Sequence, residues 1–283
     1  MILRTIVLAA ATLWASGAQA APNVVATLPP VHSIVAAVMA GAGEPVLLND
    51  GRGDPHHGSL KPSQLRALAA AELVVRVGAA MEESLEDAIN ALPESVPVVA
   101  MQSLPLYDAS ERELLDPHRW LDPAQAAALA TAVAETLAKM DAENDALYRA
   151  NAQKFALSAT AVQSEIEERL TPFEGRPFIT MHDGLAHLER ASGLERVDTA
   201  DAGHGVALGA ARMQRLRTLL ASQPDVCVLA DVGTSVRAIS ALTADTSARI
   251  VEIDPLGVKF GNGPDQWRTT MDALIAAIAG CFA

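Results

Sequence analysis

Short apolar runs alternate with helix-spaced segments along the first hundred residues of the chain. The apolar runs predict strands at residues 23–28, 45–48, 72–77 and 96–101. Helical patterns lie between them at residues 32–42, 62–71 and 81–92, the first of them after a break at Pro29 and Pro30. Strands that alternate with helices at this spacing are typical of βαβ units, so the pattern predicts a parallel sheet flanked by helices.

The last hundred residues repeat this alternation. Strands are predicted at residues 177–181, 226–230 and 248–253. Helices are predicted at residues 185–192, 208–222, 236–244 and 265–279. The fold class expected from both halves is therefore α/β, with two lobes that each hold a mostly parallel sheet.

Two long helices are predicted between these halves, at residues 123–139 and 142–170. Apolar residues recur at steps of three and four in the second one and form a single buried stripe of Phe155, Ala159, Val162, Ile166 and Leu170. At about 1.5 Å per residue this helix is roughly 40 Å long. We expect it, as a rigid spine over residues 142–171, to join lobes at residues 21–141 and 172–283. The alternative is an ordinary long core helix within one domain.

Residues 1–20 have the features of a secretory signal peptide. Arg4 provides a positive start, residues 6–14 form a short apolar run, and Ala18-Gln19-Ala20 has the small residues of a cleavage site. The apolar run is too short to span a bilayer. The sequence therefore predicts export of the mature chain.

Export would place the two cysteines, Cys227 and Cys281, in an oxidising compartment. In an oxidising compartment a single pair is expected to form a disulfide, although two separate buried thiols are the alternative. The formal net charge of −13 argues against nucleic acid as a partner and weakly favours cations near the surface.

Four potential metal ligands follow predicted strands or lie on loops stiffened by proline. His56 lies in the run DPHH, His118 lies in the run DPHRWLDP, and His182 and Asp254 directly follow strands. Open α/β sheets place their ligands at the carboxyl ends of the strands. Each histidine alone fits a structural role better, but three imidazoles and a carboxylate together suit a four-coordinate zinc ion.

In these segments the chain resembles the metal-binding subunits of bacterial ABC importers of the zinc-binding ZnuA/TroA type. The likeness continues through residues 178–182, 228–231 and 253–257, and it covers nearly the whole mature chain in order. It implies two α/β lobes joined by one long rigid helix, with the metal in the cleft between the lobes. It also implies a periplasmic, monomeric zinc carrier that serves a membrane permease and its ATPase, with a zinc chaperone as a further candidate partner.

The resemblance also implies a site. His56, His118 and His182 correspond to zinc ligands, and the pair Cys227 and Cys281 resembles the disulfide of zinc-type members.

The fourth ligand stays open, because the chain departs from the family pattern. Asp254 matches the aspartate ligand of several members, while Asp231 and a water molecule are the alternatives. His57 is a candidate supporting or substitute ligand, and His204, between two glycines, is a candidate for the cleft lining. The histidine-rich loop of zinc-type relatives is absent, and the matching residues 103–115 are short and acidic.

Zinc import is the leading functional hypothesis, with two alternatives. Manganese or iron import by the same family is one, although manganese prefers more oxygen ligands than this set offers. A zinc hydrolase is the other. It would need an open water position on zinc and a nearby base, and no base or nucleophile motif is evident. The sequence therefore predicts a binding protein rather than an enzyme.

Overall fold

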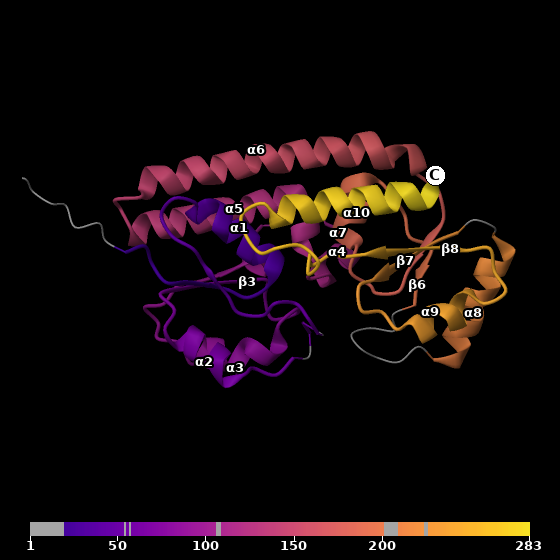
Figure 1. Ribbon diagram of the computed structural model, residues 1–283, viewed down its shortest axis with the longest axis horizontal. Helices are drawn as coiled ribbons and strands as arrows, with labels where there is room; N and C mark the ends of the chain where they lie inside the picture. Colours follow the sequence, from indigo (N-terminus) through magenta and orange to yellow (C-terminus); the bar gives the residue numbers. More distant parts are fainter. Residues whose placement is uncertain (1–19, 54, 57, 106–108, 201–208, 224–225) are drawn as a thin grey trace, which may run out of the picture.

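Two parallel sheets lie next to each other along the long axis of the molecule in the computed structural model (Figure 1). The structure describes residues 20–283 except 54, 57, 106–108, 201–208 and 224–225. The signal peptide expected at residues 1–20 therefore falls almost entirely outside the described residues.

Each sheet has four strands, and every strand pair is parallel, as the βαβ pattern predicts. The first sheet has the order β2-β1-β3-β4, from β1 (Val24–Ala26), β2 (Val46–Leu47), β3 (Leu73–Arg76) and β4 (Val98–Ala100). The second has the order β6-β5-β7-β8, from β5 (Phe178–Thr180), β6 (Asp198–Thr199), β7 (Cys227–Asp231) and β8 (Arg249–Ile253).

Helices cover both faces of each sheet. The first half contains α1 (Pro29–Met39), α2 (Pro62–Ala69), α3 (Glu86–Asn90), α4 (Glu111–Leu115), α5 (Pro123–Met140) and α6 (Asp145–Leu170). The second half contains α7 (Ala186–Ser192), α8 (Ala210–Ser222), α9 (Val236–Thr243) and α10 (Gln266–Phe282). Four 3-10 turns complete the described elements: η1 (Glu83–Leu85), η2 (Met101–Ser103), η3 (Arg119–Leu121) and η4 (Thr171–Phe173).

Several helix bounds differ from the sequence prediction, and for two helices the local reason is clear. Helix α1 begins at Pro29 rather than His32, because proline is tolerated in a first helical turn, where its missing N–H has no intrahelical partner anyway. Helix α4 lies inside the segment expected to be only a short acidic loop. Ser110 caps it by accepting the backbone N–H of Glu113, whose carboxylate accepts the N–H of Ser110 in return.

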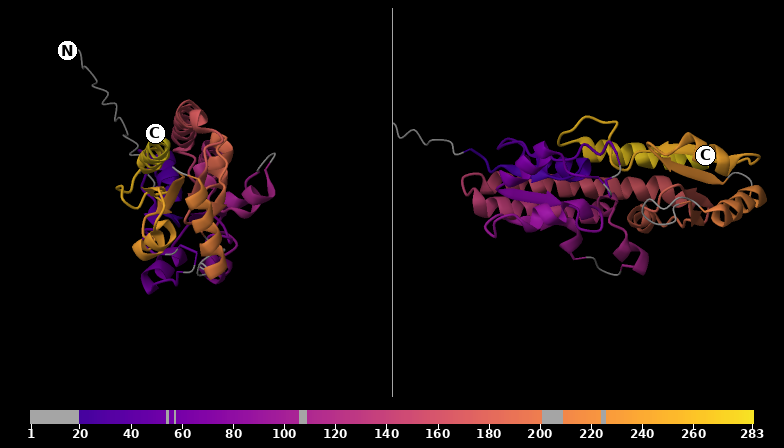
Figure 2. Two further views of the ribbon diagram at one scale, coloured as in Figure 1. Left: turned by 90° about the vertical axis from the view of Figure 1, so that its right-hand side faces the viewer. Right: turned by 90° about the horizontal axis from the view of Figure 1, so that it is seen from below.

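Helix α6 has 26 residues, a length of roughly 39 Å at 1.5 Å per residue, and it runs over both sheets (Figures 1 and 2). Its buried residues include the whole stripe that the sequence predicts, together with Tyr148 and Ala152. Helix α10 lies beside α6 and also packs against α1, so it adds a second connection between the halves. None of the helices in the described part of the chain has the length and apolar character that crossing a bilayer requires.

One apolar core continues from the first sheet to the second. Val24 and Val75 from the first sheet, Leu229 and Ile253 from the second, and Ile166 from α6 belong to the same buried cluster. Because side chains alternate across a strand, the intervening residues pack on the opposite faces: Val25 and Val74 under α2 and α3, and Val228 with the residues of α8 and α9.

A disulfide bond fastens the second sheet to the last helix. It joins Cys227, the first residue of β7, to Cys281 near the end of α10, with their Cα atoms 5.8 Å apart. The pairing expected from the sequence is thus present in the structure.

Candidate metal centre

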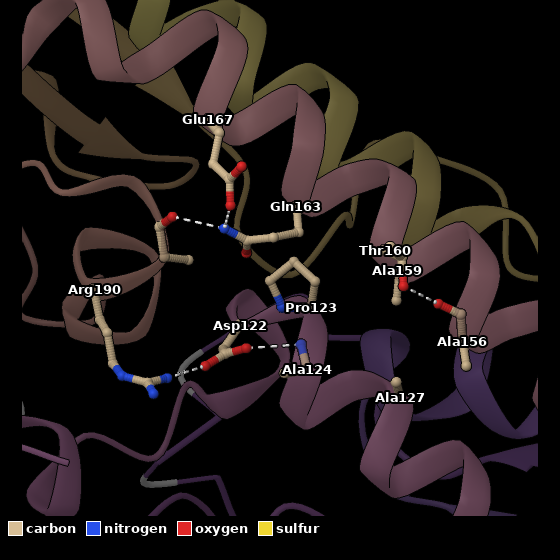
Figure 3. Close-up of a pocket in the computed structure, with 11 residues that line it drawn as sticks. Asp122, Pro123, Ala124, Ala127, Ala156, Ala159, Thr160, Gln163, Glu167 and Arg190 are labelled. Atoms are coloured by element: carbon tan, nitrogen blue, oxygen red, sulfur yellow. Dashed lines mark hydrogen bonds and ion pairs between the residues drawn. The ribbon is translucent and has the colours of Figure 1, made fainter. Parts of the chain in front are cut away.

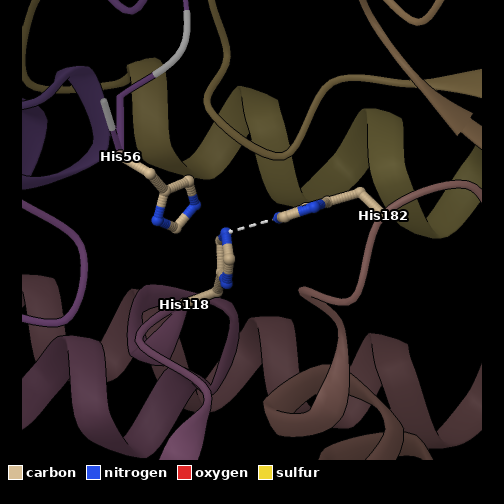
Figure 4. Close-up of side chains that lie close together, drawn as sticks. All are labelled: His56, His118 and His182. Atoms are coloured by element: carbon tan, nitrogen blue, oxygen red, sulfur yellow. Dashed lines mark hydrogen bonds between the residues drawn. The ribbon is translucent and has the colours of Figure 1, made fainter. Parts of the chain in front are cut away.

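Three histidines from separate loops converge between the two sheets (Figure 4). His56 lies in the loop after β2, His118 lies directly before η3, and His182 lies two residues after β5. Nitrogen atoms from the three rings all lie within 4.8 Å of one another, and the ring centroids are 5.1–5.7 Å apart. His56 and His118 are buried, and His182 is half-buried.

A buried carboxylate fixes the His118 ring. Asp116 Oδ1 accepts the backbone N–H of His118 at 2.9 Å and lies 2.6 Å from its Nδ1. Burial alone would raise the pKa of Asp116, but the charge and hydrogen bonds of His118 outweigh it and hold this pKa well below its usual range. An ionised carboxylate only accepts hydrogen bonds, so in the neutral imidazole of His118 the proton lies on Nδ1 and Nε2 keeps its lone pair.

The loop of His182 is held by its own ion pair. Asp183 pairs with Arg196 at 2.5 Å, and the Arg196 side chain is only 5% exposed. Gly184 then passes close to two of the imidazoles. A Cβ atom at residue 184 would lie 2.8 Å from Cε1 of His118 and 2.9 Å from Cδ2 of His182. Only a residue without a side chain fits there while the rings keep these positions.

The three histidines open onto a cleft of about 790 Å³ between the lobes. Asp231, at the end of β7, and Asp254, directly after β8, also line this cleft. Neither carboxylate belongs to the group of ligand atoms within 4.8 Å that the described residues form. Asp254 instead accepts the backbone N–H groups of Val258 at 3.1 Å and Lys259 at 2.9 Å.

His57 and His204 lie outside the described residues. His187, in α7, is fully buried, with its Nε2 2.9 Å from the carbonyl oxygen of Asp116.

Sequence reasoning missed the supporting roles of Asp116, Gly184 and His187. The pattern Asp-Pro-His contains a signal for the first of these, because it places a carboxylate two residues before a histidine. The contacts of Gly184 and His187 cross about seventy residues of chain and leave no local pattern.

A second hollow of about 530 Å³ lies among α5, α6 and α7 (Figure 3). Its polar groups are engaged with one another. Asp122 caps α5 and pairs with Arg190 at 2.8 Å, and Gln163 donates to Glu167 and to the carbonyl of Ala191. The lining otherwise consists mainly of alanines, which offer no chemistry for a ligand.

Comparison with known proteins points to one family. The family described as "Zinc-uptake complex component A periplasmic" matches residues 24–281. The "High-affinity zinc uptake system protein ZnuA" of Brucella abortus is 28% identical over 92% of this chain and 91% of its own length. The protein of that name from Paracoccus denitrificans is 29% identical over 92% of each chain.

Solved structures share the fold. A crystal structure of ZnuA superposes with a TM-score of 0.81 at 24% identity, covering 93% of this chain and all of that one. FpvC of Pseudomonas aeruginosa, solved with Mn²⁺, gives a TM-score of 0.79 at 19% identity, with coverage of 92% and 98%. The match over residues 24–281 shows that this protein belongs to the ZnuA family of periplasmic zinc-uptake components.

Proposed function

We propose that this protein binds Zn²⁺ with high affinity in the periplasm and delivers it to an ABC importer. The convergence of three imidazoles in the cleft carries the proposal, and the family membership supports it. His56, His118 and His182 are the proposed ligands. Zinc is the cargo in this scheme rather than a resident cofactor.

The spacing of the rings suits zinc. Nε2 of His118 and Nε2 of His182 lie 3.3 Å apart. Two nitrogens bound at about 2.0–2.1 Å to a tetrahedral zinc ion lie roughly 3.3–3.4 Å from each other. The pair is therefore already at ligand spacing, and imidazole is a preferred zinc donor.

Asp254 is the proposed fourth ligand, with Asp231 or water as alternatives. The two backbone N–H groups that Asp254 accepts use only part of its capacity, because a carboxylate has about four lone-pair sites. Because Asp254 lies outside the group of ligand atoms within 4.8 Å of one another, its loop must shift for an oxygen to complete the site.

Family membership also supports a proposal for the organisation of the chain and for its partners. Residues 1–20 form a cleaved signal peptide, residues 21–141 and 172–283 form the two lobes, and residues 142–171 form the connecting spine. The mature protein acts as a monomer that docks on a membrane permease driven by an ATPase, and a zinc chaperone is a candidate donor of the ion.

Manganese or iron import is the second candidate, because FpvC, which shares the fold, has been solved with Mn²⁺ and with Ni²⁺. Three nitrogen donors favour zinc over manganese. A zinc hydrolase is a weaker candidate, and we propose that the protein is not an enzyme. A test for esterase or peptidase turnover by the zinc-loaded protein would decide that point.

The decisive experiment is a competitive chelator titration of the metal-free mature protein with Zn²⁺ and with Mn²⁺. We expect tight one-to-one zinc binding and weak manganese binding. His118→Ala should lose most of the zinc affinity, whereas His32→Gln, which removes a histidine that faces Pro45 instead of the cleft, should retain it. Unchanged zinc affinity in His118→Ala would overturn the assignment, and a preference for manganese would replace the ion.

A further inference from the structure

We propose that Asp116 is the positioning residue of the metal centre. Its single carboxylate selects the tautomer of His118 and also holds the loop of His182 beside that ring. Nε2 of His118 and Nε2 of His182 are thereby held at ligand spacing before an ion binds. This inference rests on the proposed function for its meaning, but its structural part can be tested separately.

The first half of the role concerns His118. Oδ1 of Asp116 faces both the backbone N–H and the Nδ1 atom of this residue, at 2.9 Å and 2.6 Å. The Asp116 residue is 8% exposed, so water cannot readily replace it as the acceptor. With the proton held on Nδ1, the lone pair of Nε2 points toward His182, where the ion would bind.

The second half concerns the other lobe. Oδ2 of the same carboxylate accepts the backbone N–H of Ala186 at 2.8 Å, and Ala186 follows His182 by four residues. The side chain of His187 reaches the main-chain carbonyl of Asp116 at 2.9 Å, and it is fully buried. Nε2 of His187 is therefore the donor of this bond. Residue 116 thus joins the loops of both histidines.

An asparagine cannot perform both tasks. If its carbonyl faces His118, its amide N–H₂ group opposes the backbone N–H of Ala186, and two donors then meet. If the amide is flipped, the N–H₂ group faces Nδ1 of His118 and favours the tautomer with the proton on Nε2, which blocks the lone pair that the ion needs.

The chain offers a matched control in Asp122. This residue is also buried, at 2% exposed, and its Oδ2 also reaches across to the second lobe, where it accepts from Arg190 at 2.8 Å. Its other oxygen caps α5 and contacts no histidine. Asp122→Asn therefore weakens a lobe contact without touching the candidate ligands.

The test combines zinc titration with ¹⁵N NMR of the imidazoles in the metal-free protein, above the ordinary imidazole pKa. In the natural sequence His118 should show the proton on Nδ1. In Asp116→Asn the tautomer should shift toward Nε2, and zinc affinity should fall by about 10–100-fold. Asp122→Asn should keep the tautomer and an affinity within about threefold.

Two results would overturn the proposal. One is an NMR spectrum of the natural protein in which the proton of His118 lies on Nε2. This measurement needs no variant, so it remains decisive even if Asp116→Asn fails to fold. The other is an equal loss of affinity in Asp116→Asn and Asp122→Asn with the tautomer unchanged, which would make Asp116 a general stability residue. If the natural protein binds no zinc while the tautomer result holds, the proposed function fails but the positioning of His118 does not.

Discussion

The indole N–H of Trp267 donates a hydrogen bond to the main-chain carbonyl of Trp120 at 2.9 Å, and both side chains are fully buried. Trp120 follows His118 by two residues, and its own indole N–H donates to the carbonyl of Pro255 at 2.9 Å, directly after Asp254. The two indoles therefore connect α10, the η3 turn and the loop after β8 beneath the candidate metal centre.

This relationship predicts a stability effect. Trp267→Phe keeps an aromatic ring but leaves the buried carbonyl of Trp120 without this donor, so the free energy of unfolding should fall by about 1–3 kcal/mol. Guanidinium unfolding followed by circular dichroism measures this loss of free energy. Thr269→Ala, on the exposed face of the same helix, should change the free energy by less than about 0.5 kcal/mol. Equal effects of the two variants would contradict the argument.

Gly184→Ala should impair metal binding more than folding. The added Cβ would lie 2.8 Å from Cε1 of His118, so one of the two rings must move away from ligand spacing. We expect zinc affinity to fall by more than about tenfold, because displaced ligands cannot complete the tetrahedron at normal zinc–nitrogen distances. A chelator titration measures the loss.

Gly280→Ala is the matched control, since an added Cβ there meets nothing within 4 Å and the residue lies in α10. It should leave zinc affinity unchanged and slightly stabilise the helix. Wild-type affinity in Gly184→Ala would show that the histidines tolerate a wider separation of their loops.

Loss of the disulfide should reduce stability without affecting the cleft. The bond between Cys227 and Cys281 closes a separation of 54 residues, so replacing both cysteines with alanine should lower the free energy of unfolding by about 2–5 kcal/mol. Asp231, which lines the cleft, lies four residues farther along β7, roughly 13 Å away along an extended strand.

Zinc affinity of the double alanine variant should therefore stay within about threefold of the natural protein. Denaturant unfolding and chelator competition on the same sample separate the two quantities. A parallel loss of affinity would mean that the second sheet transmits strain from its covalent anchor to the site.

The buried His32 should make the protein sensitive to mild acid. Burial lowers the pKa of His32, and this effect outweighs the hydrogen bond to the carbonyl of Pro45 and the nearby charge of Glu44. Because the folded-state pKa lies below the unfolded value of about 6.5, the unfolded chain binds the proton first and stability is lost as the pH falls from that value.

Urea unfolding at a series of pH values tests this expectation. His32→Gln keeps a possible donor to Pro45 but does not titrate, so its stability should decline less than that of the natural protein between neutral pH and about pH 5. Parallel pH profiles for the two proteins would show that other groups cause the acid sensitivity.

The class of fold can be predicted from local sequence patterns alone. Valine-rich runs in alternation with helical patterns indicated two parallel sheets, and the repeated apolar residues of 155–170 indicated the long helix with one buried stripe that the structure contains. These features are predictable because apolar periodicity acts over a few residues and directly reflects which face of an element is buried. The same local signals placed His56 and His118 on loops stiffened by proline and His182 directly after a strand, while their assignment as ligands stays a prediction.

The way in which the halves are joined and the histidines are held depends instead on contacts between distant segments. The bond from Ala186 to Asp116 spans 70 residues, and the bond from Trp267 to Trp120 spans 147. The continuous core, the packing of α10 against α1 and the close approach of Gly184 to two imidazoles likewise depend on distant segments. No periodicity encodes such contacts, because they arise from the packing of whole elements and from hydrogen bonds between residues far apart in the sequence.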